Sequence, residues 1–182
     1  MAVQHLNAGH SAEAKSICRQ VLQADSAQPV ALHLLGVLAQ QAGNAERAVE
    51  LLKQALAANP DMAEAHGSLA NAYQDLGQLD AAAGSFRDAI AVMPNLTEAH
   101  SNLGNVLRDQ GKLEAAVASY RKALAINSDI AETHNNLGNA LRDLARLDDA
   151  VSSFHRAIEL QPEFAEAHNN LGVALREIGQ IE

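Results

Sequence analysis

The chain has 182 residues, of which 48% are hydrophobic and 3% aromatic, and its formal net charge is −9 at pH 7. This composition indicates a folded chain and excludes a disordered one. The acidic balance argues against nucleic-acid binding, which usually requires a basic stripe. No stretch approaches the ~18 consecutive apolar residues of a membrane span, and no charged-then-apolar leader opens the chain. We therefore expect a cytoplasmic protein that binds neither nucleic acid nor membrane.

A unit of 34 residues recurs along the chain without insertion or deletion. The segment 131–164 opens AETHNNLG, and the segments that begin at 63, 97 and 165 open AEAHGSLA, TEAHSNLG and AEAHNNLG. A fixed period of this size indicates a solenoid of stacked repeats. With positions numbered from 1 to 34 within the unit, the repeats start at Pro29, Ala63, Thr97, Ala131 and Ala165.

In chain order, residues 1–28 come first and form a partial repeat whose register places Gly9 at position 15. Four full repeats follow at 29–62, 63–96, 97–130 and 131–164. The last segment, 165–182, is a partial repeat that supplies one further first helix. We expect one continuous array over 1–182, because a single unit is too small to fold alone. Neither end shows the polar capping helix of a complete solenoid, so we expect a piece of a longer array. Apolar ends, with Ile181 at the last edge, predict weak self-association.

Two apolar stripes with helical spacing run through each repeat. Positions 4, 7, 8 and 11 share one face of a first helix, and positions 17, 20, 21, 24, 27 and 28 share one face of a second helix. Small residues recur where the two backbones would approach, because a larger side chain there would overpack the contact. At position 8 these residues are Gly36, Ala70, Gly104, Gly138 and Gly172. The sequence therefore predicts an all-α fold with two helices per repeat.

Turn residues separate the stripes at fixed positions. Position 15, where a first helix would end in the left-handed conformation, is glycine at 43, 77, 111 and 179 but alanine at Ala145. Proline at position 32 is expected to stop the second helix, and Ser128 replaces it once. Acidic or amide residues three positions before a glutamate predict capping boxes at the next first helix. These pairs are Asp61 with Glu64, Asn95 with Glu98, and Asp129 with Glu132.

This pattern resembles the tetratricopeptide repeat family over essentially the whole chain. The resemblance implies antiparallel helix pairs stacked into a right-handed superhelix, with the first helices on its concave face. It also implies a protein-interaction scaffold that binds an extended peptide or protein segment in that groove. A known use of the fold, a clamp for carboxylate termini, would need lysine at position 5. That position holds His33, Gly67, Ser101, Asn135 and Asn169, so we reject this use.

Asparagine and arginine gather on the first-helix face opposite the apolar stripe. Asparagine costs about 0.5–0.7 kcal/mol inside a helix compared with alanine, so its repeated use requires a reason. One reason is peptide binding, because each amide offers two donors and an acceptor to an extended backbone. The alternative is that the amides bond to the adjacent helix and stabilise stacking. The candidate peptide-binding residues are Asn71, Asn102, Asn105, Asn136, Asn139, Asn170, Arg108 and Arg142.

A narrower resemblance concerns first helices such as AEAHNNLG. They look like the repeat arrays that precede the catalytic region of O-linked N-acetylglucosamine transferases, where an asparagine column at position 6 holds the backbone of protein substrates. The matching residues here are Asn102, Asn136 and Asn170, whereas Leu34 and Ser68 do not match. The alternative function is therefore the substrate-recognition region of such a glycosyltransferase, with its catalytic domain outside this chain.

The sequence predicts no catalytic set, no metal and no cofactor in this chain. It has no phosphate-binding glycine loop, no HExxH and no GxSxG. Position 4 carries His66, His100, His134 and His168. Packed helices lie ~8–10 Å apart, too far for two ligands that each sit ~2.0–2.1 Å from one zinc ion, so we expect half-buried imidazoles instead. Cys18, at position 24, is predicted to be a buried apolar group.

Overall fold

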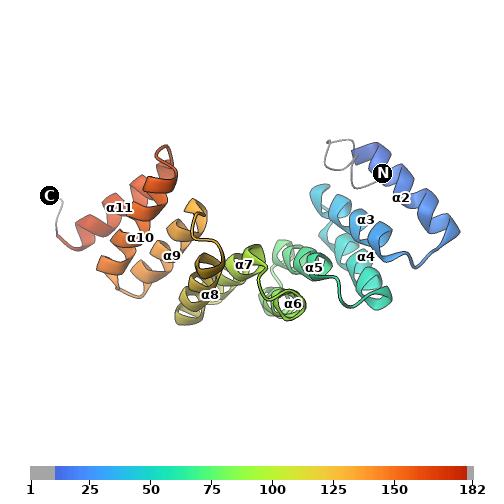
Figure 1. Cartoon of the computed structure of the whole chain (residues 1–182), viewed down its shortest axis with the longest axis horizontal. Coiled ribbons are helices and arrows are strands. Elements are labelled where there is room, and N and C mark those ends of the chain that lie inside the picture. The colour runs from blue at the N-terminus through green and yellow to red at the C-terminus, as the bar shows by residue number, and fades with distance from the viewer. Residues whose placement is uncertain (1–10, 180–182) are drawn as a thin grey trace. The chain divides into compact units, whose positions relative to one another are not determined.

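The structure, a computed structural model, describes residues 11–179, and every regular element in this range is an α-helix. Figure 1 labels the ten helices of these residues. The first helices of the repeats are α3 (Pro29–Gln41), α5 (Ala63–Asp75), α7 (Thr97–Asp109), α9 (Ala131–Asp143) and α11 (Ala165–Glu177). The second helices are α2 (Ser11–Ala24), α4 (Ala45–Ala58), α6 (Leu79–Val92), α8 (Leu113–Ile126) and α10 (Leu147–Leu160). The predicted half-helix before Gly9 and the predicted edge residue Ile181 lie outside the described residues.

The chain divides into two compact units, one ending at Pro94 and the other beginning at Asn95. In the first unit, α3 pairs with α4 and α5 with α6, while α2 packs on α3 and α4 on α5. In the second unit, α7 pairs with α8 and α9 with α10, and α9 contacts both α7 and α11. Each unit is a stack of antiparallel helix pairs, which confirms the all-α solenoid (Figure 1). The single array over 1–182 and the right-handed superhelix stay predictions.

The repeat period fixes the helix boundaries. The first helices begin at position 1 and end at position 13, and the second helices from α4 onward run from position 17 to position 30. Position 15 has a left-handed backbone, with φ between 69° and 76° at its four glycines. Ala145, at the same position, has φ 57° and is the one non-glycine residue of the described range with positive φ. The predicted turn is confirmed, and one alanine holds a conformation that glycine adopts more readily.

The predicted capping boxes are wrong by one residue. The residue that caps α5 is Met62, and it makes no side-chain capping bond, so Asp61 lies outside the helix start. The other boxes fail in the same way, because the caps of α7 and α9 are Leu96 and Ile130. The polar side chain that shapes the turn comes earlier: Asn59 Oδ1 accepts a bond from the Asp61 backbone N–H at 3.1 Å. A side chain bonded to its own backbone two residues on favours a turn over a helix cap.

The core of each repeat lies between its two helices, where position 8 faces position 24. A Cβ atom added at Gly138 would lie 2.5 Å from the Phe154 ring, and one added at Gly104 would lie 2.5 Å from the Tyr120 ring. Both rings are fully buried, so the predicted need for a small residue at position 8 is confirmed there. Cys18, on α2, is 1% exposed and is the buried apolar group that the sequence predicts.

The buried face of the first helices is wider than the predicted stripe. Positions 3 and 10 are buried as well, and Ala65 and Ala72 of α5 have no exposed surface. The reason is that α5 packs both on its own partner α6 and on α4 of the preceding repeat. Alanine adds little to a hydrophobic pattern, so the second contact leaves a weak signal in the sequence.

Candidate functional site

Five predicted asparagines and both predicted arginines lie on α7, α9 and α11 of the second unit. All seven side chains are partly exposed. The row of Asn102, Asn105, Asn136, Asn139 and Asn170 is called the asparagine row below. Because α9 contacts both other helices, the row continues from one first helix to the next. Asn71 is also partly exposed, but it belongs to α5 of the first unit.

Asn105 connects the asparagine row to the core. The fully buried Tyr120 hydroxyl donates to Asn105 Oδ1 at 2.7 Å, and Asn136 Nδ2 donates to the same oxygen at 3.1 Å. Burial raises the pKa of the Tyr120 hydroxyl, which keeps it protonated and therefore a donor. The two bonds fill both lone pairs of the amide oxygen. One oxygen thus links α7, α8 and α9.

A second link joins α9 to α11 through Asn135, which is absent from the predicted site. Asn135 is 1% exposed; its Oδ1 accepts from Asn170 Nδ2 at 3.0 Å, and its Nδ2 donates to Glu166 Oε1 at 2.9 Å. The sequence has asparagine at both positions 5 and 6 in this repeat and again in the next one. Asn169, the counterpart of Asn135, is exposed, so the asparagine pair alone does not identify the link.

Asn139 has the same repeat position as Asn105 but a different environment. Its Oδ1 is buried and accepts no hydrogen bond from any residue in the described range. Position 24 of its repeat is Phe154, which has no hydroxyl to donate. Asn170, the counterpart of Asn136, donates to Asn135 instead. The asparagine row therefore contains one acceptor without a donor.

The two predicted arginines stand beside carboxylates. Arg108 Nη2 lies 4.0 Å from Asp109 Oδ1, and Arg142 Nη2 lies 3.8 Å from Asp143 Oδ1. The arginine side chains are 31% and 24% exposed, so each pair is a loose contact near the surface. The two carboxylates therefore reduce the positive charge that Arg108 and Arg142 add beside the row.

Polar side chains bridge successive first helices in both units. In the first unit, His33 Nε2 lies 3.0 Å from Ser68 Oγ, and in the second unit the Ser101 and Thr133 hydroxyls are 3.0 Å apart. Burial lowers the pKa of His33, while Glu64 acts weakly in the opposite direction. Together with the amide bonds described above, these contacts show that part of the polar face joins neighbouring repeats.

Three family models match the sequence. One, described as TPR repeat, matches residues 104–144 and 138–179, and two, described as Tetratricopeptide repeat, match residues 39–106 and 1–63. The chain is built of tetratricopeptide repeats. The comparison with curated protein sequences gave no match.

Several solved structures are similar to this stack of tetratricopeptide repeats. The crystal structure of MamA shares 25% identity with a TM-score of 0.81, and the match covers 91% of this chain and 97% of that one. A thermophilic TPR protein of Thermus thermophilus shares 26% identity with a TM-score of 0.73, covering 96% and 95%. YrrB shares 20% identity with a TM-score of 0.78, covering 92% and 87%. The narrower resemblance to O-linked N-acetylglucosamine transferases stays a prediction.

The histidines at position 4 fasten the turn that precedes a first tetratricopeptide helix. His66 Nε2 lies 2.9 Å from the carbonyl oxygen of Pro60, six residues earlier. The same contact recurs from His134 to Ser128 at 2.9 Å and from His168 to Pro162 at 2.8 Å. His66, His100 and His134 are half-buried as predicted, whereas His168 is exposed.

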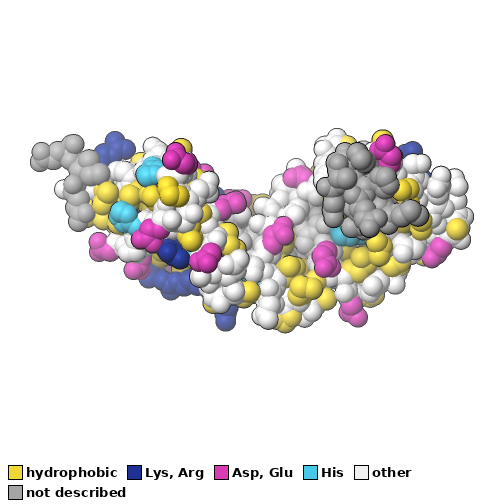
Figure 2. Space-filling view, turned by 45° about the horizontal axis from the view of Figure 1, so that its top comes forward, with side chains coloured by type: hydrophobic (Ala, Val, Ile, Leu, Met, Phe, Trp, Pro, Cys, Tyr) yellow, Lys and Arg dark blue, Asp and Glu magenta, His cyan; other side chains and the backbone are white. Residues whose placement is uncertain are grey.

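Among the described residues, no group of three or more His, Cys, Asp and Glu side chains is arranged to hold a metal ion. None of the helices in 11–179 has the length and apolar character needed to cross a bilayer. Figure 2 shows acidic side chains spread over the visible face of each unit instead of gathered in one patch. The functional groups of the repeats are thus amides, hydroxyls and scattered charges, which suit hydrogen bonding to another molecule.

Proposed function

We propose that the second unit binds an extended segment of a partner protein along the asparagine row, mainly through the partner's backbone. The observation that carries the proposal is the unused hydrogen-bonding capacity of partly exposed amides. Asn136 and Asn170 each use one N–H in the bonds described above. Each amide has a second N–H and a carbonyl oxygen, which are the groups that a peptide backbone pairs with.

The spacing of the row fits a chain in extended conformation. Packed helices lie ~8–10 Å apart and an extended chain rises ~3.3 Å per residue, so one step along the row spans about three peptide residues. Amides that pair with backbone groups ignore side chains, so the same row accepts different sequences. Arg108 and Arg142 lie on two of the same helices, three residues after Asn105 and Asn139, and offer charged contacts beside the row.

The similar structures agree with a scaffold role. A fold made of tetratricopeptide repeats is a protein-interaction scaffold, and the YrrB structure is described as a TPR protein with an unusual peptide-binding site. At 20% identity that likeness concerns the fold alone. The choice of the asparagine row as the site rests on the contacts of this chain.

The test begins with a peptide selected from a random twelve-residue display library on the wild-type protein. Asn102→Ala/Asn136→Ala/Asn170→Ala should weaken its binding roughly tenfold or more, since each amide pair contributes about 0.5–1.5 kcal/mol. The variant also loses two bonds between repeats, so its melting temperature should fall modestly. Fluorescence anisotropy and thermal melting measure the two effects separately.

Asn135→Ala is the matched control. Asn135 accepts a hydrogen bond from Asn170 between repeats, but it is buried and therefore does not contact a ligand. The variant should lower the melting temperature and leave peptide affinity unchanged. N-methylation of single peptide bonds should weaken binding more than alanine substitution of the peptide side chains does. Triple-variant binding equal to that of wild type, with a lowered melting temperature, would show that the row serves stacking alone.

A second candidate function uses the same row. Asn102, Asn136 and Asn170 all lie partly exposed on one face, as the substrate-recognition region of an O-linked N-acetylglucosamine transferase-like enzyme would require. The coding sequence downstream of residue 182 decides between the two, because a glycosyltransferase would carry its catalytic domain there. Weak self-association also stays a prediction, which sedimentation over a wide concentration range tests.

A further inference from the structure

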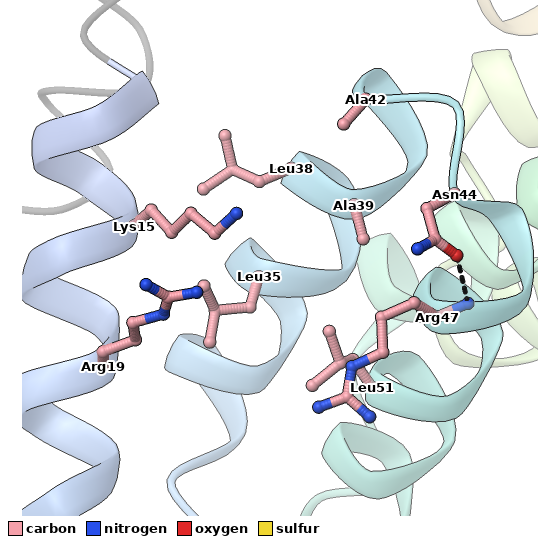
Figure 3. A pocket seen from close by; sticks show the side chains of 9 residues that line it. All are labelled: Lys15, Arg19, Leu35, Leu38, Ala39, Ala42, Asn44, Arg47 and Leu51. Carbon is pink, nitrogen blue, oxygen red and sulfur yellow. Dashed lines mark hydrogen bonds between the residues drawn. The ribbon is translucent and has the colours of Figure 1, made fainter.

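The first unit holds a pocket of about 230 Å³ between α2, α3 and α4 (Figure 3). It is called the α3 pocket here. Its lining consists of Lys15 and Arg19 from α2, Leu35, Leu38 and Ala39 from α3, Ala42 and Asn44 from the turn, and Arg47 and Leu51 from α4. The pocket shares no residue with the asparagine row, so it is a separate site.

The α3 pocket combines an apolar floor with cationic walls. Figure 3 shows Lys15 and Arg19 reaching from α2 toward the leucines of α3. Arg47 stands on the opposite wall and pairs with Glu50 at 2.7 Å, but both side chains of this pair are more than half exposed. Such a surface pair is weak and exchanges readily. Among the residues that the structure describes, the side chains of Lys15 and Arg19 make no ion pair or hydrogen bond.

The pocket exists because the first full repeat has small residues where the other repeats have large ones. Positions 11 and 14 are Ala39 and Ala42 here, but Tyr73 and Leu76 in the next repeat. The remaining repeats carry Leu107 and Gln110, Leu141 and Leu144, and Leu175 and Ile178 at these positions. Space that other repeats fill with their own side chains is therefore open beside α3.

The cations are also particular to this place in the array. Lys15 is at position 21, where the later second helices have Val49, Ala83, Val117 and Val151. Arg47 is at position 19, where they have Ala81, Ala115 and Asp149. Residues 1–94 contain five lysines and arginines, and three of them line this pocket. In a chain of net charge −9, such a concentration attracts an anionic group to one spot.

The second repeat shows which kind of group fits the open space. There, Tyr73 occupies position 11 and the Lys53 Nζ lies 5.6 Å from the centre of its ring. Lys53 is at position 25 of its repeat, the position that Arg19 holds at the α3 pocket. Arginine stacks on an aromatic ring at least as well as lysine does. An aromatic side chain supplied from outside would thus take the place of the missing tyrosine.

We propose that the α3 pocket binds a segment of a partner protein in which one aromatic side chain is flanked by carboxylates. The ring would lie on Leu35, Leu38 and Ala39 beneath the Arg19 guanidinium. Lys15 and Arg47 would pair with the flanking carboxylates, and Arg47 would exchange Glu50 for its new partner. The volume suits one side chain, because pockets for whole small molecules usually measure ~300–1,000 Å³. Recognition here reads side chains, whereas the asparagine row reads backbone.

The probe is a fluorescein-labelled peptide with one phenylalanine between two pairs of glutamates, acetylated and amidated at its ends. Wild-type protein should bind it saturably, with an affinity that falls as salt is added. A second peptide has alanine in place of phenylalanine, and a third has glutamine in place of glutamate. Both should bind at least about tenfold more weakly, because a buried aromatic anchor and its charged neighbours carry most of such binding.

The repeats themselves supply the variants. Ala39→Tyr/Ala42→Leu copies the second repeat, so it should fold with little change in melting temperature and lose about tenfold or more in affinity. Lys15→Val copies the later second helices and should weaken binding severalfold, most strongly at low salt. Arg19→Ala should also weaken binding, whereas Arg121→Ala, the same change at position 25 of α8, should not. The Arg121 control separates the pocket from general charge attraction.

Four results would overturn the proposal. The first is no saturable binding by wild type at peptide concentrations up to about 1 mM. The second is equal binding of the phenylalanine and alanine peptides. The third is wild-type affinity in the filled variant, or in Lys15→Val if the filled variant does not fold. A concentration-dependent dimer that Ala39→Tyr/Ala42→Leu abolishes would identify a second copy of the chain as the occupant, and would equally overturn it.

Discussion

The two full repeats of the second unit, 97–130 and 131–164, carry the same asparagine at position 9 but hold it differently. In the first of them, the Asn105 oxygen accepts from Tyr120 and from Asn136. In the second, the Asn139 oxygen is buried and accepts from none of the described residues. One hydroxyl on the second helix separates the two cases, because tyrosine at position 24 becomes phenylalanine in the next repeat.

A second difference lies at the turn between the helices. Gly111 adopts φ 71° in the first of these repeats, and Ala145 adopts φ 57° at the same place in the second. An L-residue with a Cβ atom is disfavoured in this region, whereas glycine is not. The repeat 131–164 therefore has two local destabilising features that 97–130 lacks. Repeats with the same backbone can therefore differ in stability because of one hydroxyl group or one Cβ atom. Point mutations can exchange these groups between the two repeats.

The largest effect on stability is expected at position 8, where both repeats have a glycine that faces an aromatic ring. Gly138→Leu should lower the free energy of unfolding by about 1–3 kcal/mol or more, because its side chain would collide with the Phe154 ring. Urea denaturation measures the loss. Gly172→Ala is the matched control: a Cβ atom there meets no atom within 4 Å, so helix propensity should make it neutral or stabilising. A wild-type midpoint for Gly138→Leu would mean that position 8 does not face position 24.

Exchanging the hydroxyl between the repeats should reverse their difference. Tyr120→Phe should lower the free energy of unfolding by about 0.5–1.5 kcal/mol, since Asn105 loses its buried donor. Phe154→Tyr should raise it by a similar amount, because the new hydroxyl would reach the vacant Asn139 oxygen. Urea midpoints of both variants and of the double exchange give the comparison. If Phe154→Tyr destabilises the protein, the two sites are not equivalent in shape.

The turn residue allows a smaller exchange. Ala145→Gly should raise the free energy of unfolding by roughly 0.5–1 kcal/mol, because relief of the left-handed strain exceeds the greater entropy of the unfolded chain. Gly111→Ala should lower it by a similar amount. Calorimetric melting of the pair is the measurement. Opposite shifts of comparable size are expected, and a destabilised Ala145→Gly would indicate that the strain is absent.

The smallest effect extends the comparison to the first unit, where the bridge between first helices contains a titratable ring. Burial lowers the pKa of His33 below its usual 6.5, so the unfolded chain takes up a proton first as the pH falls. The contribution of neutral His33 to the free energy of unfolding is therefore fully present above pH 6.5. It declines as the pH drops toward the lower pKa of His33 in the folded state. The Ser101–Thr133 bridge of the second unit has no such dependence.

The His33 effect is measured as the difference in unfolding free energy between about pH 7 and about pH 5. Wild type should lose more stability over this interval than His33→Gln does. His155→Gln, which changes an exposed histidine on α10, serves as the control and should behave as wild type. An equal pH response of wild type and His33→Gln would exclude a lowered pKa at His33.

The repeat period predicts helix boundaries well because it averages over several copies of each position. It does not predict a contact made by residues, such as alanine, that contribute little to the hydrophobic pattern. The buried Ala65 and Ala72 resemble surface alanines in the sequence, and the turn around Asn59 resembles a helix cap. Periodicity alone also hides differences between copies. The partners of Asn105 and Asn139 depend on a single residue fifteen positions later, and the α3 pocket depends on Ala39 and Ala42.

The side-chain bonds of the polar face were outside the reach of the sequence. Asn135 and Asn136 are adjacent and chemically identical, yet one is 1% exposed and the other is partly exposed. Which of them faces a neighbouring helix depends on how the repeats pack, and the sequence pattern does not encode that angle. The sequence therefore groups the candidate residues on one face of the first helices, but it does not show which amides bond to a neighbouring helix and which keep free donors and acceptors.

The hydrogen bond between the position-4 histidines and the preceding turn determines the tautomer of the imidazole ring. A carbonyl oxygen only accepts, so the Nε2 atoms of His66, His134 and His168 must carry hydrogen, and in the neutral ring the lone pair sits on Nδ1. Protonation adds hydrogen at Nδ1 and leaves the Nε2 donor in place. Nε2 is thus a donor in both forms of these rings, whereas desolvation disfavours the charged form of the partly exposed His33. In the neutral ring of each of these histidines, Nδ1 is therefore the only nitrogen with a lone pair for an acylating reagent or a transition-metal ion.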